Sequence, residues 1–266
     1  MADTTQRGAQ HLVVAAEAMH NHGDAEEDAP VPMTAPLPYA PALPGAQPPY
    51  LHAAYGSTIK RAPLRPPIRL AHTLSEVTGP GFADGWAGAN QADLTRQHKG
   101  APLGERMVLA GSVRDQDGKP VANTLVELWQ CNSSGRYTHA RDQHDAPLDP
   151  NFTGAGQVLT DAEGAYRFLT IKPGAYPWRN TYNAWRPAHI HLSVFGPAFA
   201  TRLVTQMYFP GDPLLDLDPI FQSTADAEAR ARLISRYDPN LSEAEYALGY
   251  RFDIVLRGRA ATPMET

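Results

Sequence analysis

The sequence predicts an all-β fold: an antiparallel β-sandwich core with long loops, a proline-rich N-terminal arm and little helix. From residue 105 onward, short apolar segments of strand length recur at regular intervals, separated by turn residues. In this half, residues 224–237 carry the one convincing helical pattern. Helices do not alternate with the strands, which favours antiparallel sheets packed face to face. With 266 residues and 42% hydrophobic content, the chain can fill a sizeable core.

The turn chemistry predicts two β-hairpins. The first joins "RMVLAGSVRD" (106–115) to "NTLVELWQCN" (123–132) through "QDGKP", and the second joins "GQVLTD" (156–161) to "AYRFLTI" (165–171) through "AEG". Both connections contain the glycine that tight hairpin turns favour. Three more strands are expected at "AHIHLSVFG" (188–196), "TRLVTQMYF" (201–209) and "YRFDIVLRG" (250–258).

The N-terminal quarter has a different composition. Residues 10–30 suit a short helix that ends in an acidic stretch, and from Ala29 to Pro67 prolines recur every few residues, which favours extended backbone. We divide the chain into residues 1–67, an extension and arm for subunit contacts, and residues 68–266, the β-sandwich domain. Apolar residues between the prolines favour docking over a disordered linker. They are Leu37, Tyr39, Leu43, Tyr50, Leu51 and Tyr55.

Charge and cysteine content limit the partners and the compartment. The formal net charge is −5, from 23 basic and 28 acidic residues, and no basic run stands out. Binding to nucleic acid or to an anionic membrane is therefore not expected. The single cysteine, Cys131, excludes an intrachain disulfide and suits a reducing cytosol, where we expect a buried thiol. No apolar run reaches transmembrane length, so a cytoplasmic protein is predicted.

Two long segments, residues 132–155 and 172–187, interrupt the strand pattern. Long loops in a compact domain tend to be functional. Tyrosines and arginines are concentrated in both segments, and the second leads directly into "RPAHIHL" (186–192). The two loops and the strand that follows them are therefore the predicted location of a site.

The "HIH" sequence places two histidines one residue apart in a predicted strand. Because side chains alternate along a strand, His189 and His191 face one side while Ile190, Leu192 and Val194 face the other, which we take to be the core. Two neutral imidazoles on one face suit iron, copper or zinc. The alternative is a pair of histidines hydrogen-bonded on a solvated face, and the spacing alone does not separate the two.

A two-histidine metal site needs further ligands. Residues 192–207 contain no carboxylate, which argues against a cupin-like site. A ferrous site of two histidines and one carboxylate also needs an Asp or Glu. The loops instead supply phenols, at Tyr137, Tyr176 and Tyr182. Phenolate favours ferric iron, but a phenol ionises at neutral pH only beside a strong cation. A packed ring with a hydrogen-bonded hydroxyl remains the alternative for each tyrosine.

Several segments in one order resemble the intradiol ring-cleaving dioxygenases. The resemblance covers roughly residues 50–258, and the order of its parts is more specific than any one of them. Within the family it is closest to the iron-binding beta subunits that act on protocatechuate. The matching segments are "YGSTIKRAP", "SEVTGPGF", "GRYTHARD", "DPNFTGAGQVLTDAEGAYRFLTIKPGAYPWRN", "WRPAHIHLSVFG", "TRLVTQMYFPGDPLL" and "YRFDIVLRG".

The resemblance implies a ferric centre and a ring-cleaving reaction. The family's four iron ligands, two tyrosines and two histidines, correspond to Tyr137, Tyr176, His189 and His191. One Fe(III) per catalytic site and no organic cofactor are implied. The implied reaction cleaves protocatechuate (3,4-dihydroxybenzoate) with O2 to 3-carboxy-cis,cis-muconate in aromatic catabolism. The implied partner is an alpha subunit of the same enzyme.

The resemblance also assigns roles around the metal. Tyr176 serves as ligand and as base for a substrate proton, and Arg186 stabilises negative charge that develops on the ring. Gln206 is expected near the ring or the O2 site. Four further residues are expected to line the substrate pocket, with the first a candidate for the substrate carboxylate: Tyr55, Trp178, Arg179 and Ile220.

Two rival functions remain at this point. A catechol or hydroxyquinol 1,2-dioxygenase shares the ligand set but has a helical N-terminal dimerisation region, where this chain has a proline-rich arm. A β-sandwich binding module, with the histidines and tyrosines as surface features, is the non-enzymatic alternative.

Overall fold

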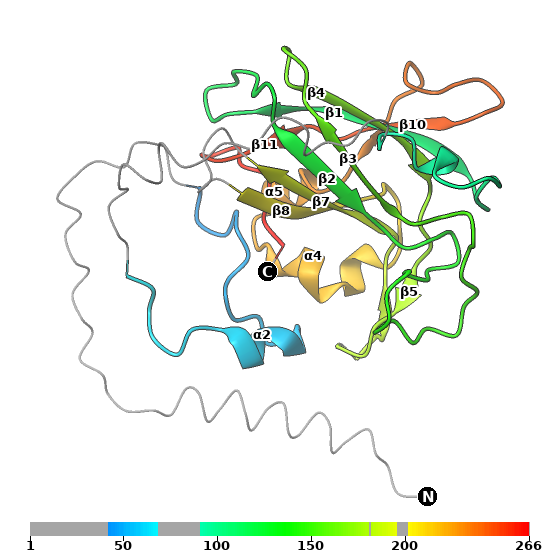
Figure 1. Cartoon of the computed structure of the whole chain (residues 1–266). Helices are drawn as coiled ribbons and strands as arrows, with labels where there is room; N and C mark the ends of the chain where they lie inside the picture. The colour runs from blue at the N-terminus through cyan, green and yellow to red at the C-terminus, as the bar shows by residue number, and fades with distance from the viewer. Residues whose placement is uncertain (1–41, 69–90, 181, 196–201, 266) are drawn as a thin grey trace, which may run out of the picture.

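The computed structural model describes residues 42–68, 91–180, 182–195 and 202–265, and their regular structure is mainly β-strand. One sheet has the strand order β11 (Ile254–Val255), β1 (Arg106–Arg114), β10 (Leu248–Arg251) and β9 (Arg236–Tyr237), and β4 (Ala165–Ile171) also pairs with β1. The other has the order β3 (Ala155–Leu159), β2 (Leu125–Trp129), β7 (His189–Phe195) and β8 (Arg202–Tyr208). The two sheets lie one on the other (Figure 1). The predicted all-β fold is confirmed.

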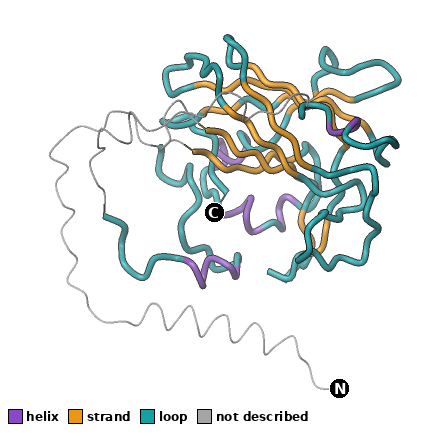
Figure 2. Tube along the Cα trace, viewed as in Figure 1, coloured by secondary structure: helices purple, strands orange, loops and turns teal. Residues whose placement is uncertain are grey.

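Smaller elements lie outside the two main sheets. A two-stranded sheet pairs β5 (Tyr176–Pro177) with β6 (Trp185–Arg186). Figure 2 shows the strands gathered in one body, with short helices and long loops beside it. The helices are α2 (Gly56–Arg61), η1 (Leu94–Arg96), η2 (Leu215–Leu217), α4 (Pro219–Ser223) and α5 (Ala227–Ala231).

The core lies between the two sheets and follows the alternation predicted for β7. Ile190, Leu192 and Val194 are fully buried members of the main hydrophobic cluster, where they meet residues of the facing sheet such as Leu109 and Phe168. Burial of each such side chain stabilises the fold by about 1.5–3 kcal/mol. His189 and His191 consequently lie on the opposite face of β7, away from this cluster.

The sheet that contains β1 is mixed, which corrects part of the antiparallel prediction. β1 pairs antiparallel with β4 but parallel with β10 and β11. The strand predicted at 250–258 is two short strands separated at Phe252 and Asp253. Between these two strands, the backbone of Phe252 lies so close to Gly111 of β1 that a Cβ on Gly111 would be 1.8 Å from the carbonyl oxygen of Phe252. Glycine at position 111 is therefore required by close backbone packing.

The prediction of two hairpins is wrong, because β1 and β2 lie in different sheets, as do β3 and β4. Both tight turns form: the amides of Gly118 and Gly164 donate to carbonyls three residues earlier, at 3.2 and 3.0 Å. After the first turn a single bridge joins Arg114 to Pro120. Asn123 then adopts a left-handed conformation (φ 52°), beyond which the chain enters the second sheet. The turns connect layers and do not extend a ladder.

The helix predicted at residues 224–237 is much shorter. It starts at the N-cap Asp226, whose carboxylate accepts from the amide of Ala229, and α5 ends after five residues. Beyond it, the carbonyl of Leu233 accepts from the amide of Tyr208 and the amide of Ser235 donates to the carbonyl of Tyr208, both at 2.8 Å. Backbone pairing with the end of β8 replaces further helical turns.

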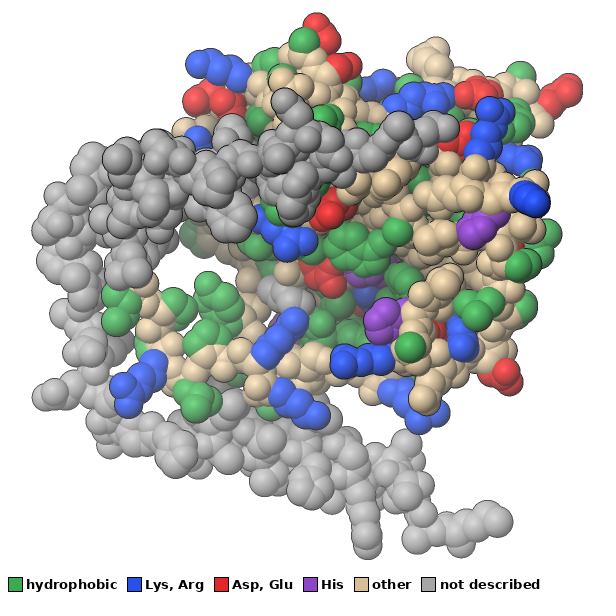
Figure 3. Space-filling model, viewed as in Figure 1, with side chains coloured by type: hydrophobic (Ala, Val, Ile, Leu, Met, Phe, Trp, Pro, Cys, Tyr) green, Lys and Arg blue, Asp and Glu red, His purple; other side chains and the backbone are tan. Residues whose placement is uncertain are grey.

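The described part of the arm, residues 42–68, consists of turns and α2. The predicted helix within residues 10–30 and the residues Leu37 and Tyr39 lie outside the described residues, and the division at residues 67 and 68 stays a prediction. Figure 3 shows basic and acidic side chains mixed over the upper part of this face, whereas basic side chains predominate along its lower edge. In the part of the chain that the structure describes, no helix is long and apolar enough to cross a membrane. Cys131 is a buried free thiol, as predicted.

Candidate active site

Adjacent strands place the predicted site residues on one surface. On β7 and β8, His189 lies opposite Tyr208 and His191 opposite Gln206. The small sheet pairs Tyr176 with Arg186, two residues before Ala188 leads into β7. Strand register alone therefore brings Tyr176 and Arg186, which lie near the two ends of the second long loop, next to the two imidazoles.

Two glycines allow the first long loop to reach the same place. Gly135 has φ +77°, and a Cβ on it would lie 2.2 Å from the carbonyl oxygen of Ala175. A Cβ on Gly174 would lie 2.5 Å from the carbonyl oxygen of Ser133. The loops that carry Tyr137 and Tyr176 are therefore in backbone contact, which no larger residue permits.

The four predicted metal ligands form one cluster. Ring centroids are 4.9 Å apart for His189 and His191, 5.3 Å for Tyr176 and His189, and 5.4 Å for Tyr137 and Tyr176. The Tyr137 and His191 centroids are 6.3 Å apart. Tyr182, the third phenol of the loops, is exposed and lies outside the cluster. Among the described residues, no group of three or more His, Cys, Asp or Glu side chains could hold a metal.

Hydrogen bonds fix both imidazole tautomers. Nδ1 of His189 is 2.8 Å from the carbonyl oxygen of Pro187, which can only accept, so Nδ1 carries the hydrogen. Nδ1 of His191 is 2.9 Å from Oε2 of Glu265 and likewise donates. Nε2 of His189 then keeps its lone pair and lies 3.3 Å from the Tyr176 hydroxyl. This is the arrangement in which imidazole binds a metal.

Burial sets the protonation of the cluster. Desolvation by burial holds the pKa of His189 well below its ordinary value, and electrostatic interactions with Arg186 and with His191 lower it further. The His189 ring is therefore neutral. Burial raises the pKa of Tyr137 well above the ordinary value of a phenol, and raises that of Tyr176 against the charge of Arg186. The Tyr137 hydroxyl is buried and has no hydrogen-bond partner among the described residues. A neutral His189 imidazole and two enclosed phenols fit a highly charged cation, whose field is needed to ionise the phenols.

Arg186 is held in a buried network beside the cluster. Its Nη2 donates to Oδ2 of Asp218 at 2.7 Å and to Oε1 of Gln206 at 2.6 Å, and its Nε lies 3.2 Å from Oδ1 of Asp218. The Tyr208 hydroxyl is 3.0 Å from Oδ2 of Asp218. Nη1 is directed to the cluster, 3.1 Å from Nε2 of His189 and 3.3 Å from the Tyr176 hydroxyl. Nε and Nη2 of the guanidinium are therefore held by Asp218 and Gln206, while Nη1 is directed to the cluster.

The predicted pocket residues are only partly brought together. The Trp178 ring lies 5.2 Å from the Arg186 guanidinium and packs edge-on against the ring of Tyr55 at 5.1 Å. Ile220 is buried and donates its amide to Asp218 at 3.4 Å. Arg179 has an exposed side chain. The contacts thus link three of the four residues to the Arg186 network.

Sequence reasoning missed four residues of this region: Trp129, Tyr208, Asp218 and Glu265. The Trp129 ring stacks on His191 at 4.9 Å with 6° between the planes. Asp218 precedes Pro219, a recognisable helix start, but that signal does not indicate its contact with Arg186, 32 residues away. Glu265 lies 74 residues from His191, and no local pattern indicates the pair.

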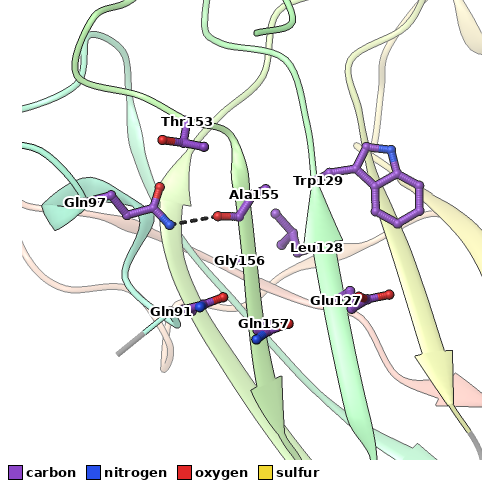
Figure 4. A pocket seen from close by; sticks show the side chains of 9 residues that line it. All are labelled: Gln91, Gln97, Glu127, Leu128, Trp129, Thr153, Ala155, Gly156 and Gln157. Carbon is purple, nitrogen blue, oxygen red and sulfur yellow. Dashed lines mark hydrogen bonds between the residues drawn. The ribbon is translucent and has the colours of Figure 1, made fainter. Parts of the chain in front are cut away.

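A separate surface pocket of about 490 Å³ lies over β2 and β3. Figure 4 shows its lining residues, including Trp129 and the hydrogen bond of 2.7 Å from Gln97 to the carbonyl oxygen of Ala155. None of the predicted site residues lines it.

Comparison with known proteins assigns the class. The family described as Dioxygenase matches residues 77–258, and the family described as protocatechuate 3,4-dioxygenase beta subunit N terminal matches residues 39–73. The chain belongs to the intradiol dioxygenase family and is an enzyme of that class.

Individual relatives narrow the comparison. The chain is 61% identical to the protocatechuate 3,4-dioxygenase beta chain of Burkholderia cepacia over 222 residues, which cover 83% of this chain and 94% of that one. It is 31% identical to catechol 1,2-dioxygenase of Candida albicans, over 67% of this chain and 61% of the relative. The mercury-inhibited structure of catechol 1,2-dioxygenase from Acinetobacter sp. ADP1 aligns with a TM-score of 0.47 and 28% identity, covering 64% of this chain and 58% of that chain.

Removing the carboxylate of Asp218 tests the buried network. Asp218 is fully buried, so Asp218→Ala leaves the charge of Arg186 without its partner and lowers the free energy of unfolding by about 3–5 kcal/mol. Urea denaturation measures this. Glu243→Ala is the control, because Glu243 and Arg167 form an exposed pair and its loss costs less than about 1 kcal/mol. Equal, small effects in both variants would show that Asp218 does not hold the buried charge.

Proposed function

We propose that this chain is the iron-binding beta subunit of a protocatechuate 3,4-dioxygenase, which cleaves protocatechuate with O2 to 3-carboxy-cis,cis-muconate. The observation that carries the proposal is the 61% identity to a beta chain of that name over 94% of the relative's length. The match to the beta-subunit N-terminal family at residues 39–73 supports it, because this is the region in which the catechol and hydroxyquinol enzymes are expected to differ.

Tyr137, Tyr176, His189 and His191 are the proposed ligands of one Fe(III). Their clustering, the Nδ1 hydrogen bonds that leave Nε2 as the nitrogen each histidine can offer to a metal, and the enclosed Tyr137 hydroxyl support this assignment. Held by these four residues, ferric iron would act as a Lewis acid that draws electron density from the catechol ring and so would activate the ring toward O2. Two phenolates offset part of the metal's charge in a site that water reaches poorly.

The chain's own residues have proposed roles around the substrate. Tyr176 accepts a proton from a catechol hydroxyl at its own phenolic oxygen. Arg186 directs Nη1 to the reacting ring and stabilises developing negative charge, since its other nitrogens are fixed by Asp218 and Gln206. Tyr55, Trp178, Arg179 and Ile220 are proposed pocket residues, with Tyr55 as the contact for the substrate carboxylate. The low exposure of the cluster limits competing water.

An alpha subunit is the proposed partner, and the arm is its proposed docking segment. Leu64 and Ile68 are 87% and 85% exposed, so both apolar side chains are accessible to a partner. The beta-chain name of the relative supports a two-chain enzyme. The proposed location is the cytoplasm, which the buried free thiol of Cys131 fits.

Substrate profiling of the co-expressed complex tests the function. We expect oxygen uptake with protocatechuate and formation of 3-carboxy-cis,cis-muconate, with kcat/KM about a hundredfold or more above that for catechol, because a site built to pair a substrate carboxylate rejects an analogue without one. A preference for catechol or hydroxyquinol would assign the chain to the 1,2-dioxygenases instead. Family membership already sets aside the binding module.

Tyr137→Phe tests the proposed ligand set. The variant loses one phenolate, so we expect a weaker tyrosinate-to-iron band in the visible spectrum while the far-UV circular dichroism stays the same. Tyr182→Phe is the control, because that side chain is 85% exposed and lies outside the cluster. An unchanged visible spectrum of Tyr137→Phe would remove Tyr137 from the ligands.

Arg186→Ser tests the electrostatic role of the guanidinium. The variant leaves the buried Asp218 carboxylate unpaired and therefore also loses stability. In the protein that stays folded and retains iron, we expect kcat to fall about 10²–10³-fold, the usual effect of removing one stabilising donor. Iron content and turnover are measured on the same preparation, and Arg167→Ser, an exposed arginine, is the control. Full turnover by Arg186→Ser would contradict the role.

A further inference from the structure

Glu265 lies near the end of the sequence yet is anchored beside the cluster. Its amide donates to the carbonyl of Val204 on β8 at 2.7 Å, and Thr205 Oγ1 donates to the carbonyl of Pro263, also at 2.7 Å. The amide of Thr262 donates to the carbonyl of Val255 on β11 at 2.9 Å. Residues 262–265, which we call the tail, are thus fastened to a strand of each sheet.

The Glu265 carboxylate accepts a hydrogen bond from Nδ1 of His191. The Nδ1 to Oε2 distance is 2.9 Å, and the two side chains are 11% and 23% exposed. A carboxylate only accepts hydrogen bonds, so it keeps the hydrogen of His191 on Nδ1.

The two histidines differ in this respect. His189 donates to a neutral backbone carbonyl, whereas His191 donates to an ionised side chain. A charged acceptor makes an imidazole a more basic ligand and restricts its rotation. The Trp129 ring, parallel to His191, restricts the same ring from its face. His191 is therefore held both in the plane of the imidazole and above it.

A residue of the arm fastens the tail. Gln47 donates from Nε2 to the carbonyl of Thr262 at 3.3 Å and accepts at Oε1 from the amide of Met264 at 2.8 Å. These bonds join positions 215 and 217 residues apart in sequence. The side-chain amide therefore spans the backbone on either side of Pro263, immediately before Glu265.

We infer that Glu265 is a positioning residue of the metal centre, and that Gln47 couples the arm to it by holding the tail in register. Glu265 acts through His191: it fixes the tautomer and orientation of that ring and so raises the affinity of the site for iron. The inference rests on the proposed function, because it assigns Glu265 to the same centre. It also predicts that the segment proposed to meet the alpha subunit is linked to iron retention.

Competition for iron tests this. The complex of the full chain with its alpha partner is loaded with iron and titrated with a chelator, and iron loss is followed by the tyrosinate-to-iron band. We expect Glu265→Ala to weaken iron binding by about 10–100-fold and to shift the band. The iron affinity of Glu265→Gln should lie between those of Glu265→Ala and the wild type, because the amide oxygen still accepts from Nδ1 but carries no charge. Gln47→Ala is expected to show a smaller weakening in the same direction.

Controls separate the outcomes. Glu243→Ala removes an exposed carboxylate that pairs with Arg167, and its iron affinity should equal that of the wild type. Thermal unfolding of the iron-free proteins separates positioning from stability, because a purely structural role would lower the melting temperature without shifting the band. Wild-type affinity and spectrum in Glu265→Ala would overturn the role of Glu265 and leave the proposed function standing. Wild-type affinity in Gln47→Ala would overturn the link to the arm, and a wild-type complex that binds no iron would overturn the function and the inference together.

Discussion

The buried charge of Arg186 is the constraint on which the arrangement of the site depends. A guanidinium with 2% exposure must be paired and hydrogen-bonded, and its three partners come from two elements: Asp218 at the start of α4, and Gln206 and Tyr208 on β8. Meeting this requirement brings the small sheet, β8 and α4 together around β7. The one amino group left over, Nη1, then faces His189 and Tyr176.

The same low exposure gives the cluster its chemistry. Burial keeps His189 neutral and raises the pKa of the phenols of Tyr137 and Tyr176, so without a cation these three side chains carry no charge that needs compensation. A ferric ion would reverse this for the phenols and supply the missing partner of the Tyr137 hydroxyl. The enclosure that keeps the two phenols protonated is thus the property that suits the cluster to a highly charged ion. The two carboxylates of this region lie outside the cluster, because Glu265 contacts His191 and Asp218 contacts Arg186.

Local patterns predicted the parts of the fold that depend on alternation and failed where pairing is long-range. The "HIH" spacing gave the two faces of β7 correctly, because one side of the strand must be apolar. The hairpins were wrong because tight turns do not determine which sheet the next strand joins, and a left-handed Asn123 carries the chain into the other layer. The helix at 224–237 was too long because backbone pairing with Tyr208 competes with it.

The site shows the same division. The histidine pair could be found from spacing, whereas Tyr137 and Tyr176 were selected among many tyrosines by the family resemblance. Asp218 and Glu265 carry no local signal, because their partners are 32 and 74 residues away and only the folded sheets bring them together. Arg179 remains a predicted pocket residue, and its side chain is exposed in the isolated chain.

The visible absorption spectrum of the purified complex, recorded before and after anaerobic addition of protocatechuate, tests the central claim most directly. A ferric centre with tyrosine ligands predicts a broad tyrosinate-to-iron band that shifts when the catechol chelates the metal. A preparation that stays colourless after iron is supplied, with the alpha partner present, would contradict the claim that these two phenols and two imidazoles form an iron site.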